Sequence, residues 1–208
     1  MQAIKLNLGC GNQLPDSWIN VDYSLGAMLA KYPLFSVLNS KLKIFNLSWN
    51  SDIFIHDLRK NFPWSNEEVD IIYSSHTLEH LNKYQGLHFL KECHRVLRKD
   101  GILRIVVPDL KAFVSAYIEG DILAEDFVEK LGVLYEEGQK STLKSQLAVF
   151  IRFPHQCMYD TESLIRIMSN VGFECCEKQP FESEIHDIKN IELPERTIEA
   201  VIVEGKKL

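Results

Sequence analysis

The sequence predicts an α/β fold built on a parallel sheet, and three observations lead to this prediction. Residues 4–8 alternate apolar and polar side chains with the period of a strand. Residues 69–73 and 102–107 are continuous apolar runs, which are typical of strands buried on both faces. Between these runs, apolar residues such as Leu87 and Leu90 recur at helical spacing. Strands that alternate with helices favour a parallel α/β sheet.

The first strand ends in a glycine-rich turn. Residues 4–8 are followed directly by Gly9, Cys10 and Gly11. Because glycine has no Cβ, such a turn can bend sharply and bring its backbone N–H groups close to a ligand. We interpret Cys10 as a small residue that fits the turn rather than as a reactive thiol.

The second strand, residues 18–21, ends at Asp22. Only residues 12–17 separate it from the glycines, and they include Pro15, so we expect a tight loop here instead of a crossover helix. An acid at this position can accept both hydrogen bonds of a ribose diol. The chain has neither a third glycine nor GxxxxGK[ST], so a nucleoside site is predicted without pyrophosphate binding.

The middle of the chain continues the alternation. Helical stretches are expected at residues 27–32 and 34–42, followed by a short strand at 53–55 and a turn at 63–66. The strand at 69–73 leads into one helix from about residue 78 to 97. Asp100 and Gly101 then form the turn into the strand at 102–107, which Pro108 ends.

The last third contains a helical segment, residues 109–153, and then returns to the sheet. Asp160 and Gly172 are expected to cap a helix over residues 162–171, and strands follow at 173–177 and 198–204. Ligands of open α/β sheets bind outside the carboxyl ends of the strands. Five strand ends are expected to meet at this edge: residues 9–11, Asp22, Asp57, residues 74–76 and residues 108–109.

Composition excludes several classes of protein. The chain has 208 residues, a length typical of one domain, and its net charge of −6 provides no basic surface for nucleic acid. No apolar run approaches the ~20 residues of a membrane span, and we expect no signal peptide. Five cysteines without CxxC spacing favour a reducing compartment. We therefore expect a soluble cytoplasmic protein that binds neither nucleic acid nor membranes.

Six segments occur in a characteristic order: LNLGCGN, WINVD, IHDLRKNFPW, VDIIYSSHTLEHL, FLKECHRVLRKDGILRIVVPDL and the later DTESLIRIMSNVGFE. With these segments the chain resembles the class I S-adenosylmethionine-dependent methyltransferases, in particular the methyltransferase type 11 group. The resemblance implies a Rossmann-like, seven-stranded, mostly parallel sheet with helices on both faces and an antiparallel last strand. We expect a single domain, 1–208, with its core in residues 1–108 and 155–208 and a helical cap or substrate insertion at about 109–154.

The resemblance also implies a cofactor, S-adenosyl-L-methionine, and residues that hold it. Asp22 would bind the ribose hydroxyls, and Asp57 and Leu58 would face the adenine. The methionine portion and the sulfonium would be bordered by Leu8, Gly9, Cys10, Gly11, Ser74 and His76. The chain departs from the family in having Asn7 where an acid is common.

His76, Glu79 and His80 form H-x-x-E-H, which also fits an inverted zinc-protease motif. That chemistry requires a third ligand and a long helix around the motif, whereas here the motif follows a buried strand, where type 11 methyltransferases commonly carry L-E-H. We therefore expect no metal ion and interpret Glu79 as a residue that orients the following helix. A milder alternative, known from some methyltransferases, is a Mg²⁺ ion held near this turn.

The expected catalytic residues are His155 and His80. After the cap the chain would return to the carboxyl edge at His155, and His80 would face the same space. A histidine can accept a hydroxyl proton near neutral pH. The alternative for His155 is that it only hydrogen-bonds the cap to the body of the domain.

The predicted function is transfer of a methyl group to an oxygen or nitrogen of a small-molecule acceptor, with sugars and polysaccharide precursors among the candidates. Two alternatives remain open: a non-catalytic S-adenosylmethionine-binding regulatory or partner protein, and a zinc hydrolase that uses His76, Glu79 and His80. Homodimer formation is also left open.

Overall fold

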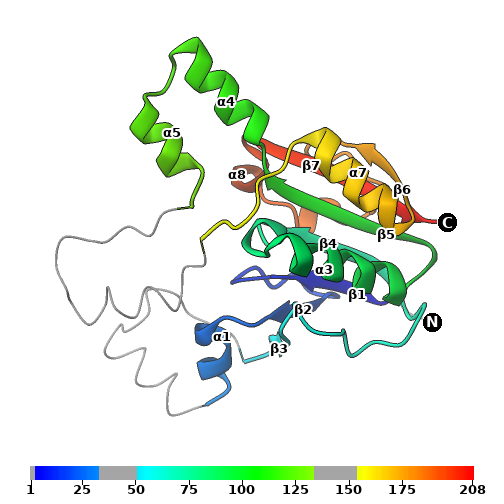
Figure 1. Cartoon of the computed structure of the whole chain (residues 1–208). Coiled ribbons are helices and arrows are strands. Elements are labelled where there is room, and N and C mark those ends of the chain that lie inside the picture. The colour runs from blue at the N-terminus through cyan, green and yellow to red at the C-terminus, as the bar shows by residue number, and fades with distance from the viewer. Residues whose placement is uncertain (1–2, 33–50, 134–153) are drawn as a thin grey trace.

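The structure is a computed structural model that describes residues 3–32, 51–133 and 154–208. Its centre is a seven-stranded sheet in the order β3-β2-β1-β4-β5-β7-β6 (Figure 1). The strands are β1 Lys5–Leu8, β2 Ile19–Asp22, β3 Phe54–Ile55, β4 Val69–Ser75, β5 Leu97–Pro108, β6 Phe173–Glu177 and β7 Ala200–Lys207. All pairs are parallel except those of β7, which runs antiparallel to β5 and β6. The predicted fold class is confirmed.

The connection from β1 to β2 contains no helix, as the short spacing predicted. Asn7 is buried, and its side chain binds the loop between β1 and β2. Its amide donates hydrogen bonds to the Gln13 carbonyl and to Asn20 Oδ1, both at 3.0 Å. The loop is thus fastened to the two strands that flank it.

One face of the sheet is covered by two helices, α3 Lys83–Val96 and α7 Thr161–Val171 (Figure 1). Phe89 and Leu90 of α3 and Leu164 and Met168 of α7 are fully buried, because each helix turns its apolar stripe toward the sheet. Asp160 and Gly172 cap α7 as predicted: the Asp160 carboxylate accepts a hydrogen bond from the Ser163 N–H at 2.8 Å, and Gly172 is left-handed at φ 117°.

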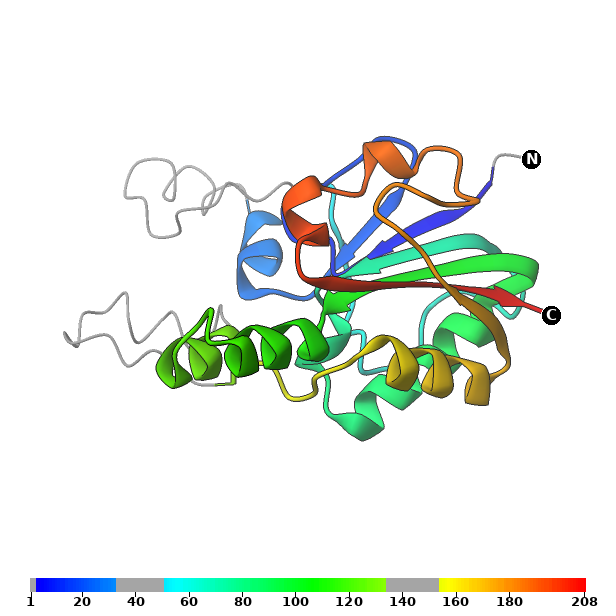
Figure 2. The ribbon, with the colours of Figure 1, turned by 90° about the horizontal axis from the view of Figure 1, so that it is seen from above.

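The opposite face is covered by the segment that contains the 3₁₀ helix η2 Ile188–Asn190 and the short helix α8 Pro194–Thr197 (Figure 2). Trp18, Tyr73 and Ile188 belong to the core cluster on this side. The sheet therefore has helical elements on both faces, and this explains why its central strands are nearly continuous apolar runs.

The prediction of one helix from about residue 78 to 97 is wrong in its extent. A 3₁₀ turn, η1 Leu78–His80, comes first, and α3 begins only at Lys83. The physical reason is a capping box. The Asn82 side chain accepts hydrogen bonds from the N–H groups of Tyr84 and Gln85, and the Gln85 side chain accepts one from the Asn82 N–H.

The turn predicted at residues 100–101 lies within β5. Asp100 has a positive φ of 63°, and the pairing with β4 shifts register between Val69 and Ile71. The chain therefore bends inside a continuous strand, because both sides of the bend still pair with β4.

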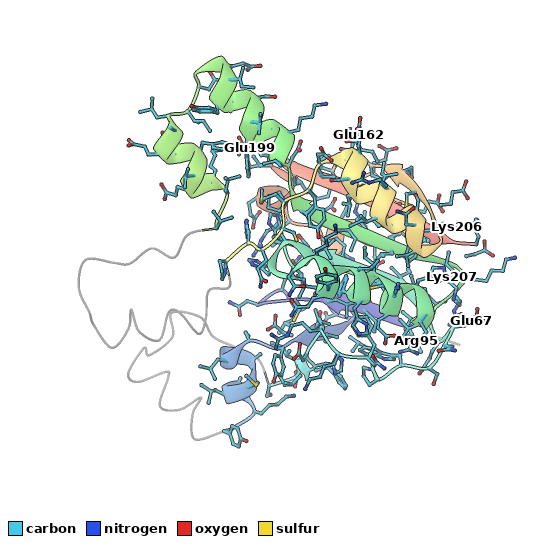
Figure 3. The ribbon with its side chains drawn as sticks, in the orientation of Figure 1. Glu67, Arg95, Glu162, Glu199, Lys206 and Lys207 are labelled. Carbon is cyan, nitrogen blue, oxygen red and sulfur yellow. The ribbon has the colours of Figure 1, made fainter. Side chains whose placement is uncertain are left out.

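The remaining helices lie near the carboxyl ends of the strands. They are α1 Leu25–Ala30, α4 Leu110–Glu119 and α5 Ala124–Lys130. Figure 1 shows α4 and α5 projecting away from the sheet. Lys130 of α5 pairs with Glu199 at 2.6 Å, and Figure 3 labels Glu199 beside these helices. The helix predicted at 34–42 and residues 134–153 of the predicted cap lie outside the described residues. Within the described part of the chain, no helix is long and apolar enough to cross a membrane.

Candidate functional site

A cavity of about 700 Å³ lies at the carboxyl edge of the sheet. This size falls within the ~300–1,000 Å³ that is usual for small-molecule sites. Seven of the predicted cofactor residues line it: Gly9, Cys10, Gly11, Asp22, Asp57, Leu58 and His76. Leu8 and Ser74 do not; they are buried beneath it, where the Ser74 hydroxyl donates to the Leu8 carbonyl at 3.0 Å.

The glycine turn after β1 is held tightly against β2. The N–H groups of Gly9 and Cys10 both donate to the Val21 carbonyl, at 2.9 and 3.0 Å. Gly9 has φ 76°, and a Cβ added to it would lie 2.0 Å from Thr77 Oγ1. The turn after β1 and the turn after β4 can therefore pack together only with glycine at this position.

Asp22 is oriented by backbone donors on both sides. Its Oδ2 accepts a hydrogen bond from the Gly11 N–H at 2.9 Å, and its Oδ1 accepts one from the Ser24 N–H at 2.6 Å. A carboxylate oxygen can accept two hydrogen bonds, so each keeps the capacity to accept one from a ligand hydroxyl. The carboxylate at the cavity wall thus suits a vicinal diol.

Asp57, at the end of β3, is paired with Arg59. The guanidinium donates from Nε to Oδ1 at 2.8 Å and from Nη2 to Oδ2 at 2.9 Å. These hydrogen bonds hold the pKa of the Asp57 carboxyl below its usual range. Arg59 also lines the cavity and was not among the predicted site residues, although its place two residues after Asp57 could have indicated the pair.

Two buried hydroxyl groups border the cavity, those of Tyr73 and Ser75, and they interact with each other. Burial raises the pKa of Tyr73 to about 12, so its phenol keeps its proton and can donate. Hydroxyl groups next to a cavity fit a ligand with polar groups. Together with the Asp22 carboxylate and the apolar Leu58, they suit the polar amino-acid portion, the ribose and the adenine of S-adenosylmethionine.

The turn after β4 carries a group of histidines around Glu79. His76 has a positive φ of 50°, which is uncommon for a residue with a side chain. Its Nδ1 lies 3.4 Å from Glu79 Oε1, and His80 Nε2 lies 4.0 Å from the same oxygen. The His155 ring lies edge-on to that of His80, with centroids 4.9 Å apart.

The rings of the two predicted catalytic histidines are therefore in contact, but only one of the two residues lines the cavity. His80 lines it, whereas His155 is not among the residues that do. His155 lies 2.8 Å from the Leu131 carbonyl through Nδ1, and burial is the main cause that lowers its pKa, which favours the neutral ring.

Sequence reasoning did not find several other residues of the cavity, among them Gln13, Gln156 and Arg196. Gln156 is brought in by the hydrogen bond of its N–H to the Glu79 carbonyl at 2.7 Å. Arg196 belongs to α8, and its backbone carbonyl oxygen lies 2.9 Å from His76 Nε2. Both contacts join distant segments, and no local pattern indicates them.

Solved structures with a similar fold come from several organisms. YcgJ from Bacillus subtilis is 12% identical, with a TM-score of 0.53 and coverage of 99% of this chain and 92% of that one. A chain of the complex between the Haloferax volcanii Trm112 methyltransferase activator and a putative methyltransferase is 13% identical, with a TM-score of 0.51 and coverage of 99% and 82%. A SAM-dependent methyltransferase from Archaeoglobus fulgidus is 14% identical, with a TM-score of 0.51 and coverage of 99% and 86%. At these identities the likeness concerns the fold alone.

No curated protein sequence matches the chain. A family model described as a methyltransferase domain, that of the type 11 group, matches residues 6–105, which include β2 to β4 and most of β1 and β5. This match identifies residues 6–105 as a type 11, S-adenosylmethionine-dependent methyltransferase domain.

Proposed function

We propose that this methyltransferase transfers the methyl group to an oxygen or nitrogen of a small-molecule acceptor. The observation that supports this most directly is the shape of the site. One cavity of about 700 Å³ contains the residues suited to the cofactor and continues to His80, Gln156 and Arg196. The acidic chain adds no basic surface for nucleic acid. Hydroxylated molecules such as sugars or polysaccharide precursors are the candidates.

In this proposal, Asp22 holds the ribose hydroxyls and Asp57 with Leu58 borders the adenine. The cofactor supplies an electrophilic methyl group on a sulfonium. The turns after β1 and β4 position it, since Gly9 and Thr77 pack against each other and leave little freedom between the two loops. Holding the two reactants close and in line provides much of the rate of such a displacement.

The acceptor is proposed to lie against His80, with His155 supporting His80 from outside the cavity. A neutral hydroxyl must lose its proton during transfer, and imidazoles are suited to assist that loss. The end of α5 holds His155 in place, because the Gly132 carbonyl accepts a hydrogen bond from the His155 N–H at 2.9 Å. We propose that α4 and α5 belong to a cap on this side.

Cofactor binding is tested by calorimetry with S-adenosylmethionine. Asp22→Ala should weaken binding by about 1–3 kcal/mol, or roughly 5- to 150-fold, because ribose hydroxyls lose their acceptor. Asp16→Ala is the matched control, since Asp16 is an exposed acid of the neighbouring loop and does not line this cavity. Equal affinity in both variants would contradict the assignment of Asp22.

The acceptor class is tested by following a labelled methyl group into separated fractions of small molecules, nucleic acid and protein. We expect label in the small-molecule fraction, and label in the macromolecules would contradict the proposal. With an acceptor identified, His80→Ala should lower the transfer rate by roughly 10²–10⁴-fold with little change in cofactor affinity. Cofactor binding without transfer to any fraction would instead favour the non-catalytic alternative.

A further inference from the structure

The Glu79 carboxylate is buried among histidines and makes no hydrogen bond in the described structure. Its side chain is 0% exposed, and neither oxygen has a hydrogen-bond partner within the described part of the chain. A carboxylate without a partner in such a place is costly, so buried acids are normally paired, hydrogen-bonded or bound to a metal ion. The groups that face Glu79 decide among these possibilities.

Three imidazoles surround this carboxylate, and each has one nitrogen next to a backbone carbonyl. His76 Nε2 lies 2.9 Å from the Arg196 carbonyl, and His155 Nδ1 lies 2.8 Å from that of Leu131. His80 Nδ1 lies 3.5 Å from the Pro154 carbonyl. A carbonyl oxygen only accepts, so these nitrogens carry protons, and in a ring with a single proton the opposite nitrogen carries a lone pair.

The lone pairs point toward the carboxylate. Nδ1 of His76 and Nε2 of His80 lie 3.4 and 4.0 Å from Glu79 Oε1. A ring nitrogen and a carboxylate oxygen at these distances are held together either by a proton on the nitrogen or by a metal ion between them. Histidines that bind metals commonly donate the other ring N–H to a backbone carbonyl, as all three rings do here.

We propose that Glu79, His80 and His155 bind one divalent transition-metal ion of the zinc type. One ligand atom from each of the three residues lies within 4.8 Å of the others. Ligand atoms around a tetrahedral zinc ion are about 3.3 Å apart, so small side-chain rotations close the site. Two imidazoles and a carboxylate are a donor set of zinc sites with an open position, and they suit zinc better than magnesium or calcium.

The backbone holds the three ligands together although they come from distant segments. The Glu79 carbonyl accepts hydrogen bonds from the N–H groups of Gln156 and Cys157, at 2.7 and 3.1 Å. The Gln156 amide in turn donates to the His80 carbonyl at 2.9 Å. Segment 154–157 is thereby fastened to the 3₁₀ turn η1. In this proposal His155 supplies the third ligand that H-x-x-E-H lacked in the sequence, whereas the sequence alone led us to expect no metal ion.

The ion would lie at the cavity wall, because His80 and His76 line the cavity. With the ion bound, His80 would act through the metal: an acceptor oxygen that reached the open position would lose its proton more easily, as water does on zinc. The metal site itself does not depend on this role, nor on the identity of the acceptor.

The experiment uses the full chain without an affinity tag, treated with a chelator and then titrated with Zn²⁺ in a calorimeter. We expect one ion for each chain, also counted by elemental analysis of the reloaded protein. Glu79→Gln, which keeps the shape of the side chain, and His155→Gln should each weaken Zn²⁺ binding at least about ten-fold. His186→Ala is the control, because His186 is an exposed histidine outside both the cavity and the cluster.

Wild-type protein that binds no Zn²⁺, or binding that survives unchanged in Glu79→Gln and His155→Gln, would overturn the proposal. A preference for Mg²⁺ over Zn²⁺ would contradict the role of the imidazoles. If one variant fails to fold, the wild-type stoichiometry and the other variant decide. S-adenosylmethionine binding by the chelator-treated wild type is measured in parallel and should be unchanged, so that a failed metal site is told apart from a failed cofactor site.

Discussion

Gly9 and Gly11 both have positive φ, at 76° and 55°, but the structure requires glycine at the two positions for different reasons. A Cβ on Gly9 would collide with Oγ1, Cγ2 and Cβ of Thr77, so rotation of that side chain cannot relieve the contact. A Cβ on Gly11 would meet nothing within 4 Å. Gly9 therefore serves packing between two loops, and Gly11 serves the backbone conformation at the cavity wall.

This contrast makes a prediction for a matched pair of variants. Gly9→Ala should lower the free energy of unfolding by about 2–4 kcal/mol, since a left-handed alanine and an overpacked contact both cost energy. Gly11→Ala should cost only about 1–2 kcal/mol for the backbone conformation. Urea unfolding of both variants measures the difference. Equal losses would show that Thr77 adapts to the added methyl group.

At the scale of elements, α3 is joined to the loop after β3 by Glu92 and Arg95. The Glu92 carboxylate accepts hydrogen bonds from the Phe62 N–H at 2.6 Å and from Arg95 Nε and Nη2 at 2.8 and 2.7 Å. Arg95 also donates to the Trp64 and Phe62 carbonyls, at 2.9 and 3.0 Å. Figure 3 labels Arg95 at the end of α3, next to Glu67, whose N–H donates to the Arg95 carbonyl at 3.1 Å. Glu92 and Arg95 thus fix the position of the loop after β3 against α3.

The hydrogen bonds from Arg95, more than any other cause, lower the pKa of Glu92 from its usual value of 4.5. A carboxyl with a lowered pKa in the folded state contributes stability above its unfolded pKa and loses it as pH falls through the folded pKa. Glu92→Gln should therefore be less stable than the wild type at pH 7, by about 1–2 kcal/mol after allowance for the partly exposed Arg95. The difference should shrink below about pH 4.5. Denaturant unfolding at about pH 3 to 7 tests this, and a constant difference would contradict it.

The elements that were predictable from the sequence are those with a local cause. The strands end where their apolar runs end, so the positions of Gly9, Asp22, Asp57 and His76 at one edge followed from the pattern. The separation of η1 from α3 was missed, since the capping role of Asn82 competes with an apolar spacing that continues through it. Gln156 and Arg196 could not be found, because long-range hydrogen bonds place them at the cavity.

At the scale of the whole molecule, a buried ion network joins the centre of the sheet to the segment that precedes α8. Arg104 of β5 is 0% exposed, and its guanidinium donates to Glu192 at 2.8 Å through both Nε and Nη2. Nη1 donates to Glu204 of β7, also at 2.8 Å. Leu193 and Arg196, which closely follow Glu192 and line the cavity, are positioned through this network.

Arg104→Met should therefore affect both stability and the site. It leaves two buried carboxylates without their cation, and removal of one partner from a buried ion pair costs about 3–5 kcal/mol. Arg104→Lys should recover only part of this loss, because an ammonium keeps the charge but cannot bind Glu192 through two parallel hydrogen bonds. Urea unfolding measures the stability of both variants, and S-adenosylmethionine titration of the folded fraction measures the site.

The matched surface control is Arg98→Met, because Arg98 pairs with Asp70 in a solvent-accessible position and its loss should cost no more than about 1 kcal/mol. If Arg104→Met cost no more than Arg98→Met, the network would not be what holds α8 and the cavity wall to the sheet.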